Sequence, residues 1–304
     1  MKVLVTGAEG FVGKYLIYHL LEEGFDVVAT YRDKKDFPGI KSYEMNILDK
    51  EKVTEIITEE KPKYIFHLAA ISNVKFSFEY PAITSKVNVE GTRNILEAAK
   101  KAGNLPSVLI IGSANEYGIP KKIPLEEDSP LNPDNPYAVS KVEAEKLALE
   151  YADKIRVLRT RSFNHIGPGQ SEDFVVSSFA RQIVKIERGK KPVLYVGNLE
   201  AKRDFTDVRD VVKAYSLILD KAENREVFNV CSGKVYSIQE ILDKLLKMTD
   251  EKIEVKKDKE RMRPSDIPIL QGSYDKLKEE TGWKPEIPIE KSLRDTLDYW
   301  RKNL

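Results

Sequence analysis

The architecture of this chain follows from residues 2–13, which read KVLVTGAEGFVG. Residues 2–6 form the apolar run of a short buried strand, and a helical period follows the last glycine. A strand, a glycine turn and a helix in this order are the context that a dinucleotide fingerprint requires. Gly7 permits the tight turn, Gly10 lets backbone N–H groups approach a pyrophosphate, and Gly13 permits close packing of helix on strand. We therefore expect a dinucleotide bound by Gly7, Gly10, Phe11, Val12 and Gly13, with an ordinary glycine-rich turn as the alternative.

Strands and helices continue to alternate along the N-terminal half. The patterns predict strands at 26–30, 43–49, 63–68 and 107–111, and helices at 51–60 and 88–102. This alternation predicts an α/β fold, a Rossmann-type doubly wound parallel sheet. Because crossovers in such sheets are right-handed, the strand ends and the ligand lie along one edge. At that edge we expect cofactor contacts from Asn46, Ile47, Leu68, Ala69 and Ala70.

The end of the second strand bears on the choice of cofactor. NAD-binding folds place an acidic residue there to bind the ribose 2′-hydroxyl, whereas this chain has Thr30, followed two residues later by Arg32. An arginine can neutralise a 2′-phosphate, so NADP(H) is favoured and NAD(H) is possible. In the alternative, Arg32 is a solvated loop residue and Asp33 serves NAD.

Residues 136–141, PYAVSK, contain a tyrosine and a lysine four residues apart. Tyr137 and Lys141 then share one helix face. An ammonium near a phenol favours the phenolate, so Tyr137 can pass a proton near neutral pH. Ser113 follows the fifth strand at the cofactor edge, where its hydroxyl could hold a substrate carbonyl or alcohol. A chance pair on an amphipathic helix and a turn serine are the alternatives.

Composition limits the remaining classes of function. The chain has 304 residues, enough for one large or two fused domains, and 50 Lys+Arg balance 49 Asp+Glu, which argues against a general polyanion binder. The longest apolar runs are too short to span a bilayer, no secretory segment precedes the first strand, and the single Cys231 fits a reducing cytoplasm. Three histidines without carboxylates at ligand spacing predict no metal site, and His67 is expected to be a packed residue. We therefore expect a cytoplasmic protein without nucleic-acid or membrane partners.

These elements together resemble the extended short-chain dehydrogenases/reductases that act on nucleotide sugars. The matching segments are TGAEGFVG at 6–13, HLAA at 67–70, NVEGT at 88–92, Ser113, and YAVSK at 137–141. The resemblance implies that Ser113, Tyr137 and Lys141 form the catalytic set, with Asn88, Tyr137 and Lys141 also at the cofactor. It further implies a homodimer formed through the helices at 88–102 and 137–151.

The C-terminal half resembles the GDP-mannose 4,6-dehydratase group, and within it the GDP-4-keto-6-deoxy-mannose reductases. The matching segments are 161–170, 202–210, 261–266 and 281–285. A diphosphate needs arginines that converge from different segments, so Arg203 and Arg263 are expected at a nucleotide-sugar diphosphate. Surface salt bridges are the alternative for either arginine, and a capping role is the alternative for Asn164. The full set expected at the substrate is Ser72, Lys75, Ser113, Asn115, Asn164, Arg203 and Arg263.

The loop at 113–118, SANEYG, separates two reactions. Sugar 4,6-dehydratases resemble Ser-Thr-Asp/Ser-Glu-x-Tyr-Gly there, and this alignment puts Asn115 at the position of the acid. An amide cannot exchange a proton near neutral pH, and Glu116 points the other way if the loop is extended. We therefore expect NADP(H)-dependent reduction of the 4-keto group of a GDP-4-keto-6-deoxyhexose, giving a GDP-6-deoxyhexose such as GDP-rhamnose. A dehydratase, an epimerase and a non-catalytic dinucleotide sensor remain alternatives, and neither the base nor the product configuration follows from the residues.

Two domains are expected, and the second is discontinuous. Residues 1–165 with about 205–231 form the NADP-binding domain, and 166–204 with 232–304 form the nucleotide-sugar-binding domain. Within these segments the patterns predict helices at 172–188, 208–220 and 237–248, and a strand at 227–230.

Overall fold

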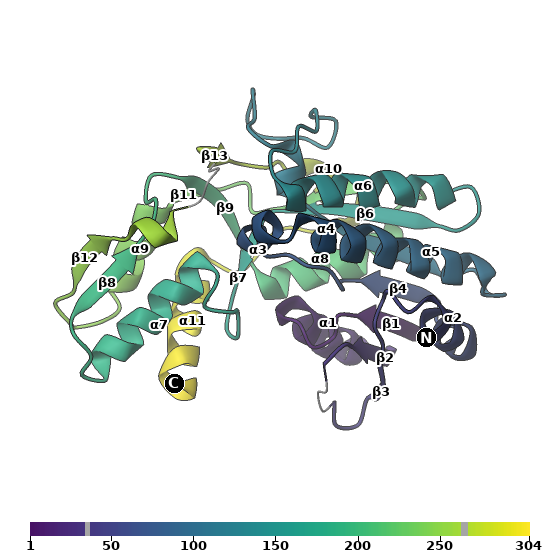
Figure 1. Ribbon diagram of the computed structural model, residues 1–304, viewed down its shortest axis with the longest axis horizontal. Helices are drawn as coiled ribbons and strands as arrows, with labels where there is room; N and C mark the ends of the chain where they lie inside the picture. Colours follow the sequence, from purple (N-terminus) through teal and green to yellow (C-terminus); the bar gives the residue numbers. More distant parts are fainter. Residues whose placement is uncertain (34–36, 263–266) are drawn as a thin grey trace.

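A seven-stranded parallel sheet forms the centre of the protein in the computed structural model, which describes residues 1–33, 37–262 and 267–304. The strand order is β10-β6-β5-β4-β1-β2-β3, and every neighbouring pair is parallel (Figure 1). The chain adds β2 and β3 on one side of β1 and then β4, β5, β6 and β10 on the other side. This strand order confirms the predicted doubly wound sheet. The strands are β1 Lys2–Thr6, β2 Asp26–Tyr31, β3 Lys41–Glu44, β4 Tyr64–His67, β5 Ser107–Ser113, β6 Val157–Ser162 and β10 Val227–Val230.

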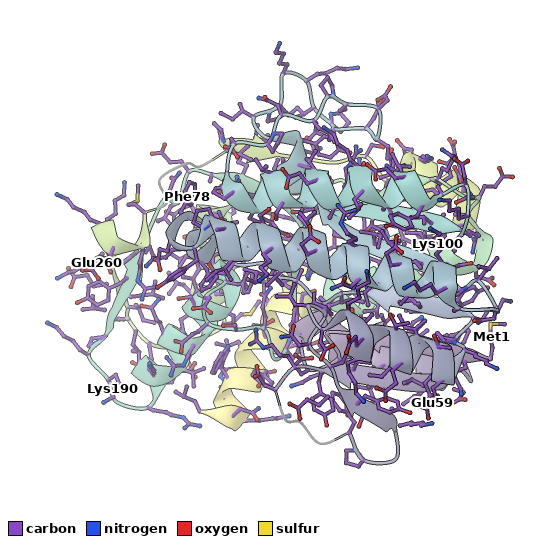
Figure 2. All side chains as sticks on the ribbon, turned by 45° about the vertical axis from the view of Figure 1, so that its right-hand side comes forward. Met1, Glu59, Phe78, Lys100, Lys190 and Glu260 are labelled. Atoms are coloured by element: carbon purple, nitrogen blue, oxygen red, sulfur yellow. The ribbon has the colours of Figure 1, made fainter. Side chains whose placement is uncertain are left out.

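Successive residues of β1 face opposite layers of helices. Val3 and Val5 pack in the core that includes helices α1 (Phe11–Glu22) and α8 (Val208–Lys221). Leu4 packs in the core formed with α2 (Lys50–Glu60), α5 (Gly91–Lys101) and α6 (Pro136–Tyr151), which lie side by side in Figure 2. Because both faces of the sheet are covered, its strands read as continuous apolar runs rather than as alternating patterns.

A smaller second unit lies beside the carboxyl ends of the strands. Its central strand β9 (Lys202–Asp207) pairs with β7 (Asn164–Ile166), β11 (Val235–Ser237) and β13 (Ile269–Leu270). A separate pair joins β8 and β12 at the left of Figure 1. A third apolar core holds this unit together. Its other elements are α7 Val175–Glu187, α9 Ile238–Leu246, α11 Ile289–Asn303, β8 Val193–Val196 and β12 Glu254–Lys257.

The observed element boundaries differ from the sequence-based ones mainly at turns. The third strand ends at Glu44, so Asn46 and Ile47 lie in a turn beyond it. The helix expected at 88–102 begins as a π-helical turn at Lys86–Glu90 and continues as α5. Several short elements were not predicted, because they are shorter than the stretch of sequence over which a helical or strand period can be recognised. These are α3 Val74–Glu79, α4 Pro81–Ser85, a 3-10 turn at Lys259–Arg261 and α10 Asp275–Thr281.

The proposed domain division has one observation against it. Leu277 and Trp283 are buried in the same core as α1 and α8, although the sequence-based division puts them in the nucleotide-sugar-binding domain. The indole of Trp283 also donates a hydrogen bond to the Asp210 carbonyl at the start of α8. We keep the division as a proposal, with the segment around α10 joined to the first domain.

Within the described ranges, no helix is both long enough and apolar enough to cross a membrane.

Candidate active site

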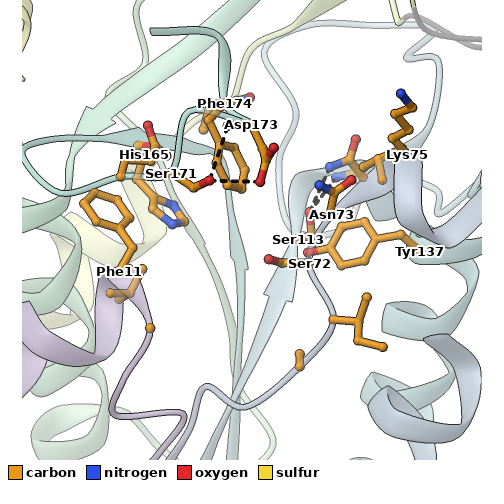
Figure 3. A pocket seen from close by; sticks show the side chains of 18 of the residues that line it. Phe11, Ser72, Asn73, Lys75, Ser113, Tyr137, His165, Ser171, Asp173 and Phe174 are labelled. Carbon is orange, nitrogen blue, oxygen red and sulfur yellow. Dashed lines mark hydrogen bonds between the residues drawn. The ribbon is translucent and has the colours of Figure 1, made fainter. Parts of the chain in front are cut away.

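A pocket of about 1270 Å³ lies between the carboxyl edge of the large sheet and the second unit. Segments from both halves of the chain line it, including the glycine turn, the loop after β4, the end of β5 and the start of α6. Phe11 and His165 stand on one side of this space, across from Ser113 and Tyr137 (Figure 3). The predicted site residues that line the pocket are Gly7, Gly10, Phe11, Val12, Gly13, Arg32, Asn46, Ile47, Leu68, Ala69, Ala70, Ser72, Lys75, Ser113, Asn115, Tyr137, Lys141, Asn164 and Arg203.

The glycine turn has the geometry that a pyrophosphate needs. Gly7 has φ +68°, and a Cβ on it would lie 2.9 Å from the backbone nitrogen of Ala69. A Cβ on Gly13 would lie 2.4 Å from the Gly7 carbonyl oxygen, so the helix could not approach the strand. No side chain caps the start of α1 at Gly10, which leaves the helix N-terminus facing the pocket. These features fit a dinucleotide.

Two charged residues that follow β2, Arg32 and Asp33, and Glu9 of the glycine turn lie around the expected position of the adenosine ribose. Arg32 and Asp33 form an exposed ion pair, with 2.8 Å between Nη2 and Oδ2. The Arg32 backbone N–H donates to Glu9 Oε1 at 3.0 Å, which links this loop to the glycine turn. The guanidinium is largely exposed, so it can turn toward a phosphate without breaking a buried contact.

Asn88 does not line the pocket, contrary to its expected place at the cofactor. It is buried, and its amide accepts from the Ile71 N–H and donates to the Ile71 carbonyl. Its Nδ2 also donates to Ser140 Oγ at 2.9 Å. Asn88 therefore ties the loop after β4 to helix α6, and it acts on the pocket only through that loop.

Ser113 is oriented by the neighbouring residue Asn115. Ser113 Oγ accepts from the Asn115 backbone N–H at 3.2 Å and from Asn115 Nδ2 at 3.1 Å. These two bonds occupy both lone pairs of the hydroxyl, so in any further hydrogen bond the Ser113 hydroxyl is the donor. The Ser113 hydroxyl is also a hydrogen-bonding partner of the Tyr137 phenol.

Tyr137 and Lys141 lie on one face of α6, but their electrostatics differ from the sequence-based expectation. Burial raises the pKa of Tyr137 to about 12, against a smaller lowering by the hydrogen bond with Ser113. Burial lowers the pKa of Lys141 to about 8, and its Nζ donates to the Ile111 carbonyl at 2.8 Å. The expected lowering of the Tyr137 pKa by Lys141 is therefore not found in this structure. Tyr137 is a protonated phenol, the form that a proton donor needs.

Glu116 does point away from the pocket, but for a different reason from the one expected. Residues 114–117 form a 3-10 turn rather than an extended loop, and Ser113 is its N-cap. The turn carries Glu116 into the interior, where it is completely buried. Its Oε1 accepts the Ser113 backbone N–H at 2.6 Å.

On the substrate side, Arg203 projects from β9 into the pocket and donates to the Ile267 carbonyl at 2.6 Å. Arg263 lies outside the described residues. Arg261, in the same RMRPSD segment, lines the pocket and donates to Ser178 Oγ at 3.2 Å. Sequence reasoning missed Arg261 because two arginines two residues apart carry no signal about which of them faces a ligand.

Three further lining residues were not predicted. Phe174 and Tyr195 come from segments without a recognisable motif, and Gln170 lies at the end of the 161–170 motif without an assigned role. Gln170, Phe174 and Tyr195 all line the pocket. Gln170 is buried, and its Nε2 donates to the His165 carbonyl at 2.9 Å. The side of the pocket opposite Tyr137 is therefore formed by tertiary contacts that no local sequence pattern predicts.

The two histidines near the site serve packing. His67 is buried between the hydroxyls of Thr6 and Thr92, at 2.9 and 3.1 Å. Burial, with a smaller effect of Lys141, lowers the pKa of His67 to about 3. His165 stacks on Phe11 with 6.1 Å between ring centroids. In the described parts of the chain no group of three or more His, Cys, Asp or Glu could hold a metal ion.

A doubly wound sheet, a glycine turn at its central strand and a Ser-Tyr-Lys set at its carboxyl edge define an extended short-chain dehydrogenase/reductase, an NAD(P)-dependent class of enzyme. Comparison with known proteins gives the family. Residues 4–296 match the profile described as GDP-mannose 4,6 dehydratase, and the chain belongs to this family.

Individual relatives cover the whole chain. GDP-6-deoxy-D-mannose reductase of Pseudomonas aeruginosa is 37% identical over 308 residues, covering 100% of this chain and 98% of the relative. Human GDP-mannose 4,6 dehydratase is 29% identical over 332 residues, with coverages of 96% and 89%. The solved structure of RMD from Pseudomonas aeruginosa complexed with NADPH superposes with a TM-score of 0.89 at 36% identity, covering 100% and 99%. A UDP-glucose 4-epimerase from Thermus thermophilus in complex with NAD gives 0.90 at 29% identity, covering 100% of both chains.

Proposed function

We propose that this protein reduces the 4-keto group of a GDP-4-keto-6-deoxyhexose with NADPH, giving a GDP-6-deoxyhexose such as GDP-rhamnose. The similarity to a GDP-6-deoxy-D-mannose reductase over the full length supports the substrate class. The similarity to a structure complexed with NADPH, together with Arg32 at the end of β2, supports the cofactor.

One observation carries the choice of reduction over dehydration. Asn115 lines the pocket where a dehydratase needs its acid, and both of its donors are directed at Ser113 Oγ. An amide in that role orients a hydroxyl but cannot remove and return protons during loss of water. The epimerase alternative is supported only by fold likeness, which by itself does not assign a reaction.

Three side chains perform the proposed chemistry. NADPH, when bound along the glycine turn, supplies the hydride. Tyr137 donates its phenolic proton to the developing alkoxide, and the Ser113 hydroxyl turns from Tyr137 to donate a hydrogen bond to the same oxygen. The Lys141 ammonium stabilises the phenolate left on Tyr137 and holds the cofactor ribose.

At the other end of the pocket we propose that the substrate diphosphate binds between arginines of the second unit. Arg203 and Asn164 line this region on β9 and β7, and Arg261 approaches from the segment before β13. We assign Arg263 to the same phosphate site from its sequence motif alone. Arginines are suited to this role because their planar forks match phosphate oxygens.

We further propose a cytoplasmic homodimer. Helices α5 and α6 lie next to each other on one face of the molecule (Figure 2). Pairing these two helices with their copies would form a four-helix contact. Molar mass by light scattering tests this part, because a monomer at micromolar concentration would contradict it.

Stoichiometric oxidation of NADPH tests the reaction itself. The protein is incubated with NADPH and a panel of nucleotide-linked 4-keto-6-deoxysugars, and both the loss of NADPH absorbance and the product configuration are followed. We expect one NADPH consumed per GDP-linked ketone. Conversion of GDP-mannose to the 4-keto sugar without net NADPH consumption would identify a dehydratase instead.

A further inference from the structure

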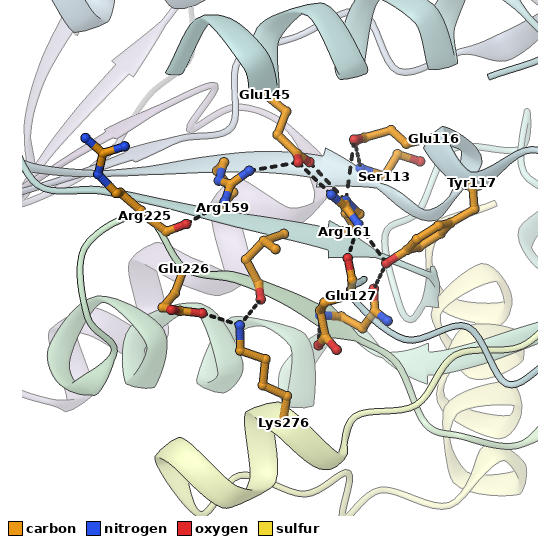
Figure 4. Close-up of polar contacts among 12 residues, drawn as sticks. Ser113, Glu116, Tyr117, Glu127, Glu145, Arg159, Arg161, Arg225, Glu226 and Lys276 are labelled. Atoms are coloured by element: carbon orange, nitrogen blue, oxygen red, sulfur yellow. Dashed lines mark hydrogen bonds and ion pairs between the residues drawn. The ribbon is translucent and has the colours of Figure 1, made fainter. Parts of the chain in front are cut away.

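A buried network of carboxylates and arginines lies beside Ser113 (Figure 4), and none of its four members lines the pocket. Glu116 reaches it from the turn after β5, Glu145 from α6, and Arg159 and Arg161 from β6. Each of these four side chains is more than nine-tenths buried, so their charges interact with little screening by solvent.

Glu145 holds the arginines of this network. Its Oε1 accepts from Arg159 Nη1 at 2.8 Å and from Arg161 Nη2 at 2.7 Å, and its Oε2 accepts from Arg161 Nε at 3.0 Å. The remaining Arg161 nitrogen donates to the Tyr117 hydroxyl and to the Glu127 carbonyl. Because two guanidinium groups stabilise it, Glu145 stays ionised, and its pKa is lowered despite its burial.

Glu116 accepts fewer hydrogen bonds than Glu145 does. Its Oε1 accepts the Ser113 N–H, but its Oε2 has no hydrogen-bond donor among the described residues and lies 3.8 Å from Arg161 Nε. The Glu145 carboxyl is within hydrogen-bonding reach of the Glu116 side chain. Two carboxyl groups can form such a bond only if one of them carries a proton. Because Glu145 accepts the hydrogen bonds of the arginines, Glu116 is the carboxyl on which such a proton is favoured, and burial together with the Glu145 charge raises the pKa of Glu116 well above its usual value.

The backbone next to Glu116 is shaped to admit its carboxyl. A Cβ on Gly112 would lie 2.5 Å from Glu116 Oε1 and 2.3 Å from the Thr160 carbonyl oxygen. Any other residue at 112 would therefore displace either the carboxyl or strand β6. The Ser113 N–H, which Glu116 holds, belongs to the residue that follows this glycine.

The pKa of Lys141 depends on whether Glu116 in this network is charged. Glu145 lies one helical turn along α6 from Lys141, and both line a small cavity of about 10 Å³. The described contacts include no ion pair between them, because the arginines occupy the Glu145 oxygens. A charge on Glu116 would raise the pKa of both Tyr137 and Lys141, so it would oppose the anionic oxygens that the reaction creates beside Ser113.

We propose that Glu116 is a positioning residue that works as a neutral carboxylic acid: it accepts the Ser113 backbone N–H, donates a hydrogen bond to Glu145, and keeps negative charge away from the reacting oxygen. This role rests on the proposed reductase function. The ionisable groups that interact with it are Glu145 and Lys141 on α6, Arg159 and Arg161 on β6, and Tyr137. Arg161 in turn donates to the Tyr117 hydroxyl and to the Glu127 carbonyl.

Two substitutions of Glu116 test whether this side chain acts as a neutral acid or as a carboxylate. In Glu116→Gln the amide oxygen can still accept from Ser113 and the amide nitrogen can still donate to Glu145, so we expect kcat within about threefold of the wild type. In Glu116→Ala both contacts are lost, and we expect kcat to fall by about tenfold or more while KM for the sugar nucleotide is unchanged. A loss of about tenfold or more in Glu116→Gln, or full activity in Glu116→Ala, would overturn the proposal.

An infrared measurement tests the protonation state without requiring turnover. At neutral pH the wild-type protein should show the carbonyl stretch of a buried protonated acid, and the same band should be missing from folded Glu116→Gln. Glu127→Gln is the matched control: Glu127 is another carboxyl with a raised pKa in this region, and the Glu116 band should persist without it. A wild-type spectrum identical to that of Glu116→Gln would refute the neutral acid even if Glu116→Ala fails to fold. A wild type with the band but without NADPH oxidation would instead count against the proposed function.

Discussion

Replacement of Tyr137 by phenylalanine isolates the proton transfer from every other function of the site. The Tyr137 ring is 7% exposed, and a phenyl ring fills the same space on α6. Only the hydroxyl is lost, together with its hydrogen bond to Ser113. The glycine turn that is proposed to bind the cofactor and the arginines of the second unit are left in place, so binding should survive.

The expected magnitude follows from the protonation state of the phenol. With a pKa of about 12, Tyr137 is fully protonated at neutral pH and can deliver its proton in every turnover. A positioned general acid contributes about 10²- to 10⁴-fold to rate, which corresponds to about 3–5 kcal/mol of barrier. We therefore expect kcat to fall by two to four orders of magnitude, with KM for the nucleotide sugar changing by less than about threefold.

Steady-state oxidation of NADPH, measured for both variants and the wild type, gives kcat and KM separately. Tyr151→Phe is the matched control, because it removes a buried tyrosine hydroxyl from the same helix, where that hydroxyl donates to Glu97. This control should keep wild-type turnover. Wild-type turnover in Tyr137→Phe, or an equal loss in both variants, would refute Tyr137 as the proton donor.

Three further perturbations probe the scaffold and the cofactor. Gly13→Ala places a Cβ 2.4 Å from the Gly7 carbonyl and should cost about 3 kcal/mol or more of folding free energy in chemical denaturation, whereas Gly103→Ala, with open space around it, should not. Arg32→Ala should raise KM for NADPH by about tenfold or more with little effect on NADH, and equal effects on both cofactors would contradict a 2′-phosphate contact. Burial opposes the ionised form of Glu60, but hydrogen bonds from neighbouring lysine and tyrosine side chains lower its pKa to about 2, below its usual 4.5. Its stabilising effect is therefore present above pH 4.5 and lost as the pH falls toward 2, so Glu60→Gln should lower Tm at pH 7 and not at pH 2.

Local chemistry made the fold and the central part of the site predictable. The turn at Gly7 requires a positive φ, and the close approach at Gly13 excludes a side chain, so both leave a direct mark on residue identity. The pairing of Tyr137 with Lys141 depends only on the helical period, and the place of Ser113 depends only on where a buried strand ends. Such features act over a few residues, and a sequence displays them without reference to the rest of the chain.

The burial of individual side chains and their long-range contact partners could not be predicted from the sequence. The lysine one turn away predicted a lowered pKa for Tyr137, but burial of this residue raises its pKa to about 12. Asn88 belongs to a cofactor-site motif, yet its amide is used entirely by Ile71 and Ser140.

Glu116 is the clearest case of this limit. Its neutral state depends on Glu145, on arginines of β6 that occupy Glu145, and on a glycine that makes room for its carboxyl. The free energy of an ionisable group depends on every charge and dipole around it, and these come from segments that only the packed chain brings together. Residue identity and spacing therefore set the architecture and the reacting trio, whereas three-dimensional packing set the protonation states with which that trio works.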